Sequence, residues 1–342
     1  MNCIIYYKPE DLNEAVGYYL GIMESALKLH FSNVLHSNNI ENIHSDDVVA
    51  MISHACLLEV LKKNRKQKTI FWWQGIVPEE LIYGEKSPSL RLRVKFYYYR
   101  FLEYYFLKKT NFNLFVSNAM RRHFNQLYDF NKDNYVVMPC FNQMINDKLF
   151  YTPNKYTAPS FVYAGGILKW QCVDEALQLY GMVKRKYPNA TMTLLTRNQD
   201  EARALVEKHQ LENVIIKFVP LDQLNEELGK YKYGMLLRTD DPVNNVATPT
   251  KFNSYLAVGI IPIISRAIED YGKITDKMRY AVCTDNEKDF QSAFEQIDRI
   301  EQQQISPDDI LAEYKQIFDS YYNESLYIDC IIKKLQEIFP EN

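Results

Sequence analysis

The chain has 342 residues, of which 47% are hydrophobic and 24% are charged, a balance typical of a soluble globular protein rather than a disordered or fibrous one. This length exceeds the size at which a single core keeps growing, so two domains are expected. The formal net charge of -3, without a basic or acidic tail, gives no reason to expect a nucleic-acid partner.

In residues 1–150, short apolar runs alternate with longer helical patterns, which is typical of a parallel sheet covered by helices. Strands are predicted at 3–7, 48–53, 69–73, 114–117 and 135–138. Helices are predicted at 12–30, 54–64, 89–109 and 118–127, the last with Ser117 as its N-cap. Three prolines and several asparagines then predict a linker over residues 139–160.

A second alternation follows the linker. Strands are predicted at 161–166, 190–196, 214–219, 233–238, 260–265 and 280–283. Helices are predicted at 172–187, 199–209, 221–230, 250–258 and 287–303, with one or two closing helices at 306–338. The fold class expected is therefore α/β, with two doubly wound, Rossmann-like domains at 1–150 and 151–342 and a ligand cleft at the carboxyl ends of both sets of strands. Packing of the C-terminal helix back on the first domain is left open.

Charge divides unevenly between these two parts. Residues 1–150 carry +3 (18 basic and 15 acidic residues), whereas residues 151–342 carry -6 (22 basic and 28 acidic). The first part is therefore the better candidate for lying close to an anionic partner.

The six cysteines and six histidines are scattered. The cysteines form no CxxC pair, which indicates a reducing compartment, and the histidines form no HxxxH or HExxH arrangement, so no metal site is expected. The start of the sequence lacks a signal-peptide pattern, and no uncharged run approaches the roughly 20 residues that span a bilayer. We expect a cytoplasmic protein.

The stretch "FVYAGGILKWQCVDEALQLY" joins an apolar strand to a helix through Gly165 and Gly166. Backbone amides can approach an anion closely at such a turn, and the helix that follows adds the positive end of its dipole. A plain turn is an equally good interpretation, because the full GxGxxG dinucleotide pattern is absent. Trp170 fits either stacking on a base or sugar, or closing the core behind the turn.

A lysine near a helix start marks a second stretch, "YGMLLRTDDPVNNVATPTKFNSYLAVGIIPIIS". Arg238 is expected at the end of a strand, and Lys251 in the first turn of a helix with Thr248 as N-cap and Pro249 at N1. A cation is unfavourable at a helix N-terminus unless an anion, such as a diphosphate, binds both the amides and the ammonium group. The alternative is that Lys251 is a solvated surface residue.

On these two stretches the sequence resembles the GT-B glycosyltransferases, specifically glycosyltransferase family 4 and its bacterial polysaccharide members. In those enzymes a "P-x-K-x-x-E-Y-L-A-x-G-x-P" stretch closes the nucleotide-sugar site. The first half agrees, with "DDVVAMISHACLLEVLKKNRKQKTIFWWQGIVPEE" and "NFNLFVSNAMRRHF" resembling the strands and the "QG-x-x-PEE" loop of such transferases. The resemblance covers nearly the whole chain.

The resemblance implies a transferase that moves a sugar, with retention, from a UDP- or GDP-linked donor to a glycan or lipid-linked acceptor in cell-surface polysaccharide or capsule synthesis. It implies no bound cofactor and no metal, because Arg238 and Lys251 would supply the positive charge. The second domain would bind the donor and the first the acceptor. The residues implied for donor binding are Gly165, Gly166, Lys169, Trp170, Gln171, Thr196, Asn245, Thr248, Pro249, Thr250 and Ser254.

Four positions depart from the family pattern. Family 4 enzymes usually carry two glutamates eight residues apart, the second of which holds the donor ribose, and here those positions are Val246 and Ser254. An arginine and a lysine that often bind the donor phosphates are replaced by Gly166 and Gln171. Fewer cationic side chains are therefore available to bind a diphosphate than is usual in the family.

By the same resemblance, His54, at the carboxyl end of a predicted strand, or a group in "QGIVPEE" would face the sugar or acceptor, which makes His54 a candidate catalytic residue and Gln74, Gly75 and Glu79 candidate acceptor contacts. A capping or half-buried histidine is the alternative for His54. Glu79 and Glu80 are equally suited to the first turn of a helix.

The stretch "RLRVKFYYYRFLEYYFLKK" mixes basic and aromatic residues. This mixture suits a peripheral contact with the inner membrane surface, but its charges do not segregate to one face, which favours a packed interdomain helix instead. Two other functions stay open: a nucleotide-sugar epimerase of the same architecture, and a degenerate, non-catalytic partner subunit.

Overall fold

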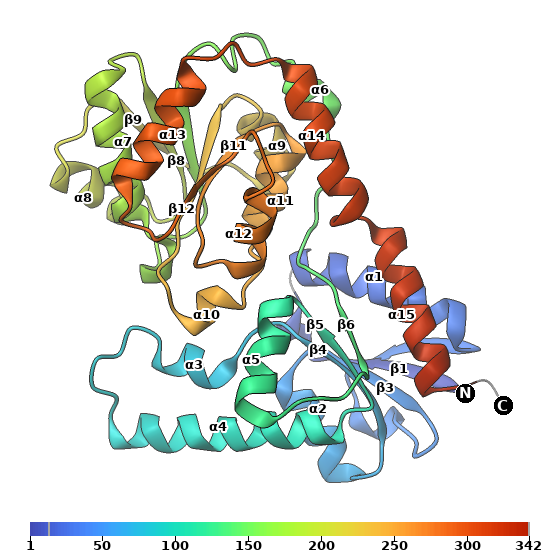
Figure 1. Ribbon diagram of the computed structural model, residues 1–342. Coiled ribbons are helices and arrows are strands. Elements are labelled where there is room, and N and C mark those ends of the chain that lie inside the picture. Colours follow the sequence, from blue (N-terminus) through green and yellow to red (C-terminus); the bar gives the residue numbers. More distant parts are fainter. Residues whose placement is uncertain (13, 341–342) are drawn as a thin grey trace. The chain divides into compact units, whose positions relative to one another are not determined.

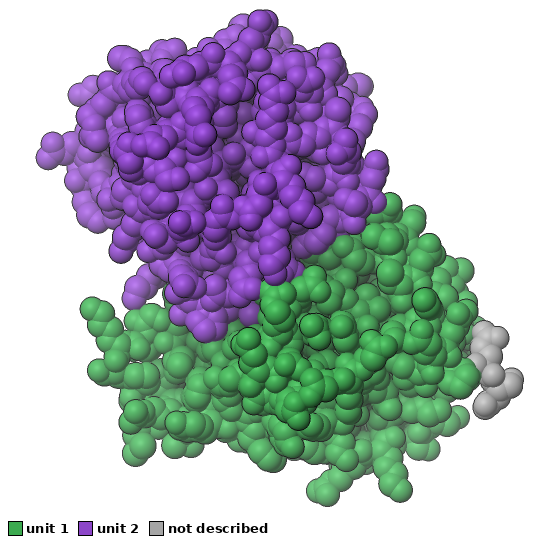
Figure 2. All heavy atoms as spheres, viewed as in Figure 1, with its two compact units in different colours: residues 1–142, 323–342 green, residues 143–322 purple. Residues whose placement is uncertain are grey.

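The computed structural model of the protein describes residues 1–12 and 14–340 (Figure 1). The chain divides into two compact units, one formed by Met1–Asn142 with Asn323–Asn342 and the other by Gln143–Tyr322 (Figure 2). Each unit is built on a six-stranded parallel sheet covered by helices, so the predicted α/β class with two Rossmann-like units is confirmed.

The sheet of the first unit has the order β2-β1-β3-β4-β5-β6. Strand order reverses between β1 and β3, which makes the carboxyl ends of these two strands the switch point of this unit. Most of the strands are apolar runs without exposed positions, as expected for a sheet covered on both faces. Their bounds are β1 (Asn2–Tyr6), β2 (Asn33–Ser37), β3 (Val48–Met51), β4 (Lys68–Trp73), β5 (Phe112–Phe115) and β6 (Tyr135–Val137).

The helices of the first unit are α1 (Glu14–His30), α2 (His54–Lys63), α3 (Val77–Ile82), α4 (Leu90–Lys109), α5 (Asn118–Tyr128) and α15 (Glu324–Ile338). Ser117 caps α5 as predicted, because its side chain accepts a hydrogen bond from the amide of Met120 at 2.8 Å. The last helix, α15, packs on α1, and the ring of His30 is 2.9 Å from the carbonyl oxygen of Phe339. Helix α15 therefore belongs to the first unit.

The sheet of the second unit has the order β12-β11-β10-β7-β8-β9, which is the classic 3-2-1-4-5-6 order of a dinucleotide-binding fold read from the other edge. Strand order reverses between β7 and β10, where Tyr233 pairs with Phe161. Their carboxyl ends form the switch point. The bounds are β7 (Ser160–Ala164), β8 (Thr191–Leu195), β9 (Val214–Lys217), β10 (Tyr233–Leu236), β11 (Ile261–Ser265) and β12 (Val282–Thr284).

The second unit contains both long covering helices and very short ones. The bounds are α6 (Asp147–Phe150), α7 (Val173–Lys186), α8 (Gln199–Lys208), α9 (Leu221–Leu228), α10 (Pro242–Asn245), α11 (Thr250–Ala257), α12 (Glu269–Thr275), α13 (Phe290–Glu301) and α14 (Pro307–Ser320). Short single-turn helices at Pro9–Asp11, Ile40–Asn42 and Lys169–Gln171 complete the elements.

The sequence did not predict β2, α3, α6, α10 or α12. β2 lies at the edge of the sheet, and none of its five residues is buried. It therefore lacks the apolar run by which the other strands were predicted. The four helices are seven residues long or shorter, too short to show a helical period. The predicted linker at 139–160 is also not a plain connection, because it contains α6 with the fully buried Phe150.

The N-cap of α11 differs from the prediction by one residue. The helix begins at Thr250, and Pro249 is its N-cap with φ -62° and ψ 132°, so Thr248 is not the cap and Pro249 is not the first helical residue. Proline suits the cap position, since its fixed φ matches this extended geometry. The helix ends at Ala257, one residue before the predicted end, and Gly259, whose φ of +77° lies in the left-handed region, directly follows its C-cap Val258.

Within residues 1–12 and 14–340, no helix combines the length and the apolar character needed to cross a bilayer.

Candidate functional site

The candidate site is built around the switch point of the second unit. Gly165 directly follows β7, Arg238 lies two residues beyond the end of β10, and Lys251 is in the first turn of α11, the second helix after β10. Ligands of open α/β sheets bind at the carboxyl ends of the strands on either side of such a reversal. The two stretches singled out in the sequence therefore meet where a ligand is expected.

Gly165 is required by both its backbone and its neighbour. Its φ is +138°, a conformation that residues with a side chain rarely adopt. A Cβ at this position would also lie 2.8 Å from Cε and 2.9 Å from Nζ of Lys251. The glycine thus gives the lysine side chain room to lie across the turn after β7.

Lys251 is held by neutral groups. Its Nζ donates hydrogen bonds to Oε1 of Gln171 at 2.6 Å and to the hydroxyl of Tyr163 at 3.1 Å, and it lies 4.2 Å from the centroid of the Tyr163 ring. No carboxylate of the described residues forms an ion pair with it. The side chain is therefore positioned by neutral partners and not by a carboxylate.

Tyr163, in β7, is a site residue that the sequence did not single out. Burial raises the pKa of its hydroxyl, which stays protonated and donates to the carbonyl oxygen of Gly166. The hydroxyl thus connects Lys251 to the glycine turn. The available signal was a tyrosine in a buried strand two residues before the glycines, since a buried hydroxyl needs a partner.

Two cations influence each other at this switch point. Burial and the nearby guanidinium of Arg238 together hold the pKa of Lys251 well below its ordinary value. Arg238 is only 4% exposed, and its backbone is fixed by Ser265, which accepts from the Arg238 amide at 2.9 Å and donates to the Arg238 carbonyl at 2.6 Å. Such a pair of neighbouring cations favours an anion between or beside them.

Tyr255 fixes the helix that carries Lys251. Its hydroxyl donates to the carbonyl oxygen of Met235 in β10 at 3.2 Å and accepts from the amide of Ala164 in β7 at 3.3 Å. The ring lies over Gly234, where a Cβ would come within 2.5 Å of it. The first turn of α11 is therefore locked to both strands of the switch point.

Gly166, Lys169 and Trp170 continue the turn after β7. Gly166 has ordinary space around it, since a Cβ there would be 3.7 Å from Oδ1 of Asn198. Lys169 is exposed and Trp170 is half-buried, and both lie with Gln171 in a single 3-10 turn. They form one side of the candidate site.

The remaining candidate donor contacts have local structural partners. Thr196 is buried, and its hydroxyl accepts from the amide of Asn198 at 3.0 Å. Asn245 donates to Asp240 at 2.8 Å and to the carbonyl of Ala267 at 3.1 Å. Thr196 and Asn245 thus shape the loops around the site.

The positions of the two missing family glutamates are occupied by non-acidic groups. Val246 is buried at the end of α10. The Ser254 hydroxyl donates back to the carbonyl oxygen of Thr250 at 3.1 Å, one turn earlier in α11. Neither side chain offers a carboxylate to a ribose.

His54 lies in the first unit, as the first residue of α2 at the carboxyl end of β3. Its ring packs against Phe71, Trp73 and Phe106 with centroid distances of 5.2, 5.3 and 5.8 Å, and Nε2 is buried without a hydrogen-bond partner. Burial lowers the pKa of His54 to about 4. The imidazole is therefore neutral at physiological pH.

The QG loop of the first unit contains one exposed and several engaged groups. Gln74 is exposed, whereas a Cβ on Gly75 would lie 2.0 Å from Oε1 of Glu80, which accepts from the amide of Ile76. Glu79 and Glu80 both lie in the first turn of α3, in agreement with the helix-dipole interpretation. A side chain at position 75 would therefore displace the Glu80 carboxylate from the Ile76 amide.

Glu79 belongs to a buried polar cluster in the first unit. Its carboxylate is 7% exposed and lies 2.7 Å from Arg100 and 3.4 Å from Nε2 of His123. Next to it, the fully buried Glu103 accepts from the Val77 amide at 3.1 Å and from the Tyr128 hydroxyl at 2.7 Å. These contacts join α3, α4 and α5.

Burial, and secondarily the charge of Glu79, raise the pKa of Glu103 to about 8. The sequence did not single out Glu103, because an acidic residue among tyrosines carries no signal of burial by itself.

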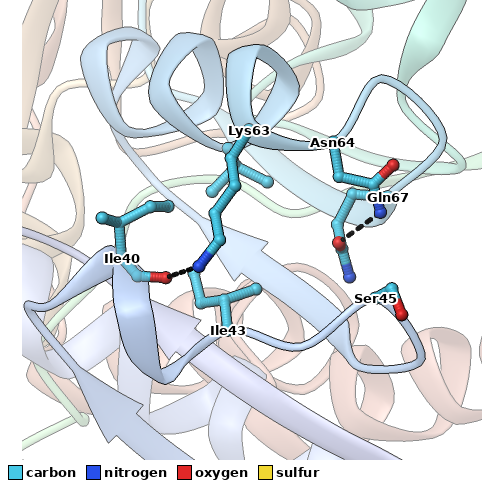
Figure 3. Close-up of a pocket in the computed structure, with 7 residues that line it drawn as sticks. Ile40, Ile43, Ser45, Lys63, Asn64 and Gln67 are labelled. Atoms are coloured by element: carbon cyan, nitrogen blue, oxygen red, sulfur yellow. Dashed lines mark hydrogen bonds between the residues drawn. The ribbon is translucent and has the colours of Figure 1, made fainter.

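A cavity of about 310 Å³ in the first unit lies away from these strand ends (Figure 3). Ser45 and Gln67 of its lining precede β3 and β4, so the cavity is at the amino ends of the strands. Its polar groups bond to one another: Lys63 donates to the Ile40 carbonyl at 2.8 Å, and Asn64 to Gln67 at 2.9 Å. We assign it no part in the site.

Comparison with known proteins gives structural neighbours only. No protein-family model matches the sequence, and no curated protein matches it. A trehalose-6-phosphate structure from E. coli, bound with UDP-2-fluoro glucose, superposes with a TM-score of 0.66 over 100% of both chains at 11% identity. WaaG, a glycosyltransferase involved in lipopolysaccharide biosynthesis, superposes with a TM-score of 0.62 over 96% of this chain and 98% of that one at 12% identity.

A third neighbour is longer than this chain. TarM of S. aureus, in a complex that includes alpha-GlcNAc-glycerol and UDP, superposes with a TM-score of 0.61 at 12% identity. The superposition covers 87% of this chain but only 56% of the length of TarM. At such identities the likeness establishes the fold alone. Together with the two six-stranded parallel sheets, it identifies that fold as GT-B.

Proposed function

We propose that the protein is a glycosyltransferase similar to family 4 that moves a sugar from a UDP- or GDP-linked donor to a glycan or lipid-linked acceptor, with retention, in the synthesis of a cell-surface polysaccharide. The second unit binds the donor, and the first unit binds the acceptor. Three structural neighbours support this proposal: TarM is in complex with UDP, the E. coli structure is bound with a UDP-sugar, and WaaG is a glycosyltransferase.

The observation that carries the proposal is Lys251, which hydrogen-bonds to Gln171 and Tyr163 and forms no ion pair with a carboxylate of the described residues, beside Arg238 at the switch point of the second unit. Desolvating an ammonium group without a carboxylate partner is unfavourable, so the arrangement calls for an anionic ligand. The amide of Gly165 already donates to the carbonyl oxygen of Leu195 at 2.9 Å, so the amide of Gly166, at the same strand end, is the backbone group proposed to bind the same anion. A nucleoside diphosphate fits these groups.

In the proposed reaction, the site holds the diphosphate leaving group and offsets the charge that develops as the sugar leaves. Lys251 and Arg238 supply that positive charge, which makes a metal ion unnecessary in this proposal. The acceptor hydroxyl attacks on the face that the diphosphate leaves, so the configuration at the sugar carbon is retained. Positioning provides most of the remaining rate acceleration.

The nucleoside end of the donor is held differently from the family pattern. With Val246 and Ser254 in place of the two glutamates, the ribose contacts fall to neutral groups, among which Trp170, Thr196, Asn245, Thr248 and Thr250 are proposed. Pro249 and Gln171 contribute by shaping the start of α11 and by orienting Lys251. We expect a weaker grip on the nucleoside than in enzymes that have both carboxylates.

On the acceptor side, the proposal gives His54 the part of a neutral group rather than of a general base, because a pKa of about 4 leaves it little basicity. Gln74 is the exposed candidate contact. Glu79 takes part through the ion pair with Arg100 that positions α3, the helix after the Gln74–Gly75 turn.

A thermal-shift screen against a panel of nucleotide sugars tests the proposal, since a donor at 100 times its dissociation constant stabilises the fold by about 2.7 kcal/mol. The donor that binds is then incubated with and without glycan acceptors, and the anomeric configuration of the product is read by NMR. A transferase needs the acceptor, whereas an epimerase turns over the donor alone. A degenerate partner subunit shows neither a shift nor turnover. Undiminished transfer by a His54→Ala enzyme removes that residue from the mechanism.

A further inference from the structure

Helix α4 of the first unit carries a row of exposed apolar side chains. Leu90 is 79% exposed, Tyr97 is 70% exposed, and Val94 and Phe101 are each 62% exposed, and Tyr104 continues the row. Their spacing of four, three, four and three residues places them on one face of the helix. Tyr98, which is 50% exposed, widens this face.

The same helix has a second apolar face that is buried. Leu102, Phe106 and Leu107 pack into the first unit together with Glu103. At about 100° per residue, these positions lie on the side opposite to the exposed row. A surface helix normally turns a polar face to water. Here apolar residues occupy both sides.

The exposed row begins where the helix has no buried residue. Within the described helix, every position from 90 to 101 is exposed or half-buried, so none of the side chains in its first three turns is fully buried against the unit. Figure 1 shows α4 as a long helix at the rim of this unit. An apolar face of this length on a solvent-exposed helix marks an interaction surface.

Basic residues surround the exposed face. Arg91, Arg93 and Lys95 are exposed near the start of the helix, and Lys108 and Lys109 at its end. Glu103, the acidic residue within α4, is buried on the opposite side. The outer surface of the helix is therefore cationic and aromatic at once.

This charge pattern selects between two occupants. A second copy of α4 laid against the first, in either direction, would bring basic residues against basic residues at the helix ends. An anionic lipid surface instead offers phosphate charges to the lysines and arginines and an interfacial region to the tyrosines.

We propose that the exposed face of α4, formed by Leu90, Val94, Tyr97, Tyr98, Phe101 and Tyr104 with Arg91, Arg93 and Lys95 beside them, docks the protein on an anionic bilayer surface. The apolar side chains enter the headgroup region, and the basic side chains bind lipid phosphates. This inference does not depend on the donor site in the second unit. Membrane docking would bring the protein to lipid-linked acceptors if the proposed function holds.

Co-sedimentation of the whole protein with phosphatidylcholine vesicles, with and without phosphatidylglycerol, tests the proposal. We expect binding only to the vesicles that contain phosphatidylglycerol. The triple variant Arg91→Gln, Arg93→Gln, Lys95→Gln should lose affinity by roughly 100-fold, at about fivefold for each charge near the surface. Replacing Tyr97 and Phe101 by serine should lose at least about tenfold.

The matched control is the triple variant Lys62→Gln, Arg65→Gln, Lys66→Gln, which removes the same charge from exposed positions elsewhere in the first unit. It should bind vesicles like the wild type. An equal loss in this control, or no binding of the wild type to anionic vesicles, would overturn the proposal, as would a concentration-dependent dimer that the Tyr97 and Phe101 replacements dissolve. UDP titration of the same samples reports the second unit separately. Melting temperatures show that each variant is folded.

Discussion

Lys251 Nζ donates a hydrogen bond of 2.6 Å to the side-chain amide oxygen of Gln171, the position at which the proposed family 4 pattern has a phosphate-binding lysine. The amide holds the ammonium group without cancelling its charge. Two lysines in these positions would repel each other in the empty site, whereas lysine and glutamine form a stable pair that still attracts an anion. If the proposed function holds, glutamine at position 171 leaves Lys251 free of a second cation on this side of the site.

A Gln171→Glu variant tests this relationship. The new carboxylate would pair with Lys251 and neutralise it with almost no change in side-chain shape. We expect the affinity for UDP or GDP to fall at least about tenfold, while the melting temperature stays the same or rises, because breaking one charge-assisted contact to the diphosphate costs about 1.5–3 kcal/mol. Undiminished nucleotide affinity would place the diphosphate away from Lys251.

Gly165→Ala should damage both stability and binding. The alanine would have to adopt a φ of +138° with its Cβ 2.8 Å from Lys251, so we expect a loss of at least about 2 kcal/mol in the free energy of unfolding. Gly166→Ala is the matched control for stability, since its Cβ would meet only ordinary contacts at 3.7 Å and beyond. Chemical denaturation of the two variants measures the difference, and equal losses would contradict the account of Gly165.

Nucleotide binding should take up protons. Burial and Arg238 hold the pKa of Lys251 low in the empty site, and a bound diphosphate would raise it. Between the two pKa values the complex holds one more proton than the free protein, so affinity should fall as pH rises, by at most about tenfold per pH unit. Calorimetry in buffers of different ionisation enthalpy measures the uptake. A Lys251→Met protein should lose this uptake, and its persistence there would assign it to another group.

Glu103→Gln should change how stability depends on pH. The pKa of Glu103 is raised from 4.5 to about 8, so over this range the folded protein holds a proton that the unfolded chain releases. The stability from the protonated carboxyl is fully present below about 4.5 and is lost as pH rises toward 8, with a slope of at most about 1.4 kcal/mol per pH unit. The glutamine variant lacks this slope. Denaturant unfolding of both proteins across that range checks the prediction, and parallel curves would contradict it.

The strands and long helices were predictable because their signals are local. An apolar run such as "VVAM" at Val48–Met51, or a helix that buries one stripe, is visible in a short window of sequence. The edge strand β2, at Asn33–Ser37, has no buried residue, and only its pairing with β1 makes it a strand. A local sequence pattern does not show which distant segments pair with each other.

The candidate site was predictable where the backbone itself carries the signal. Gly165 and Lys251 were identified from a turn and a helix start, but their contact depends on the order of β7 and β10 in the sheet. Tyr163 reaches Lys251 through that same packing and left little trace in the sequence. The buried Glu103 was missed for a comparable reason, since only tertiary structure gives it Tyr128 as a partner.

The basic and aromatic helix shows a different limit of sequence reasoning. Its apolar residues do not segregate to one side because two apolar faces lie opposite each other, one toward Phe106 and one toward Phe101. A search of the sequence for a single apolar helix face therefore finds none in this helix. Burial in the structure separates the two faces, and the outer one becomes recognisable as a surface.

The most direct test of the central claim is calorimetric titration of the wild-type protein with UDP and with GDP, repeated with a Lys251→Ala variant and with Lys273→Ala, an exposed lysine of α12, as the control. We expect one of the two nucleotides to bind, Lys251→Ala to weaken that binding by about 10- to 100-fold, and Lys273→Ala to leave it unchanged. Wild-type protein that binds neither nucleotide, or a Lys251→Ala protein that binds as tightly as the wild type, would contradict the central claim.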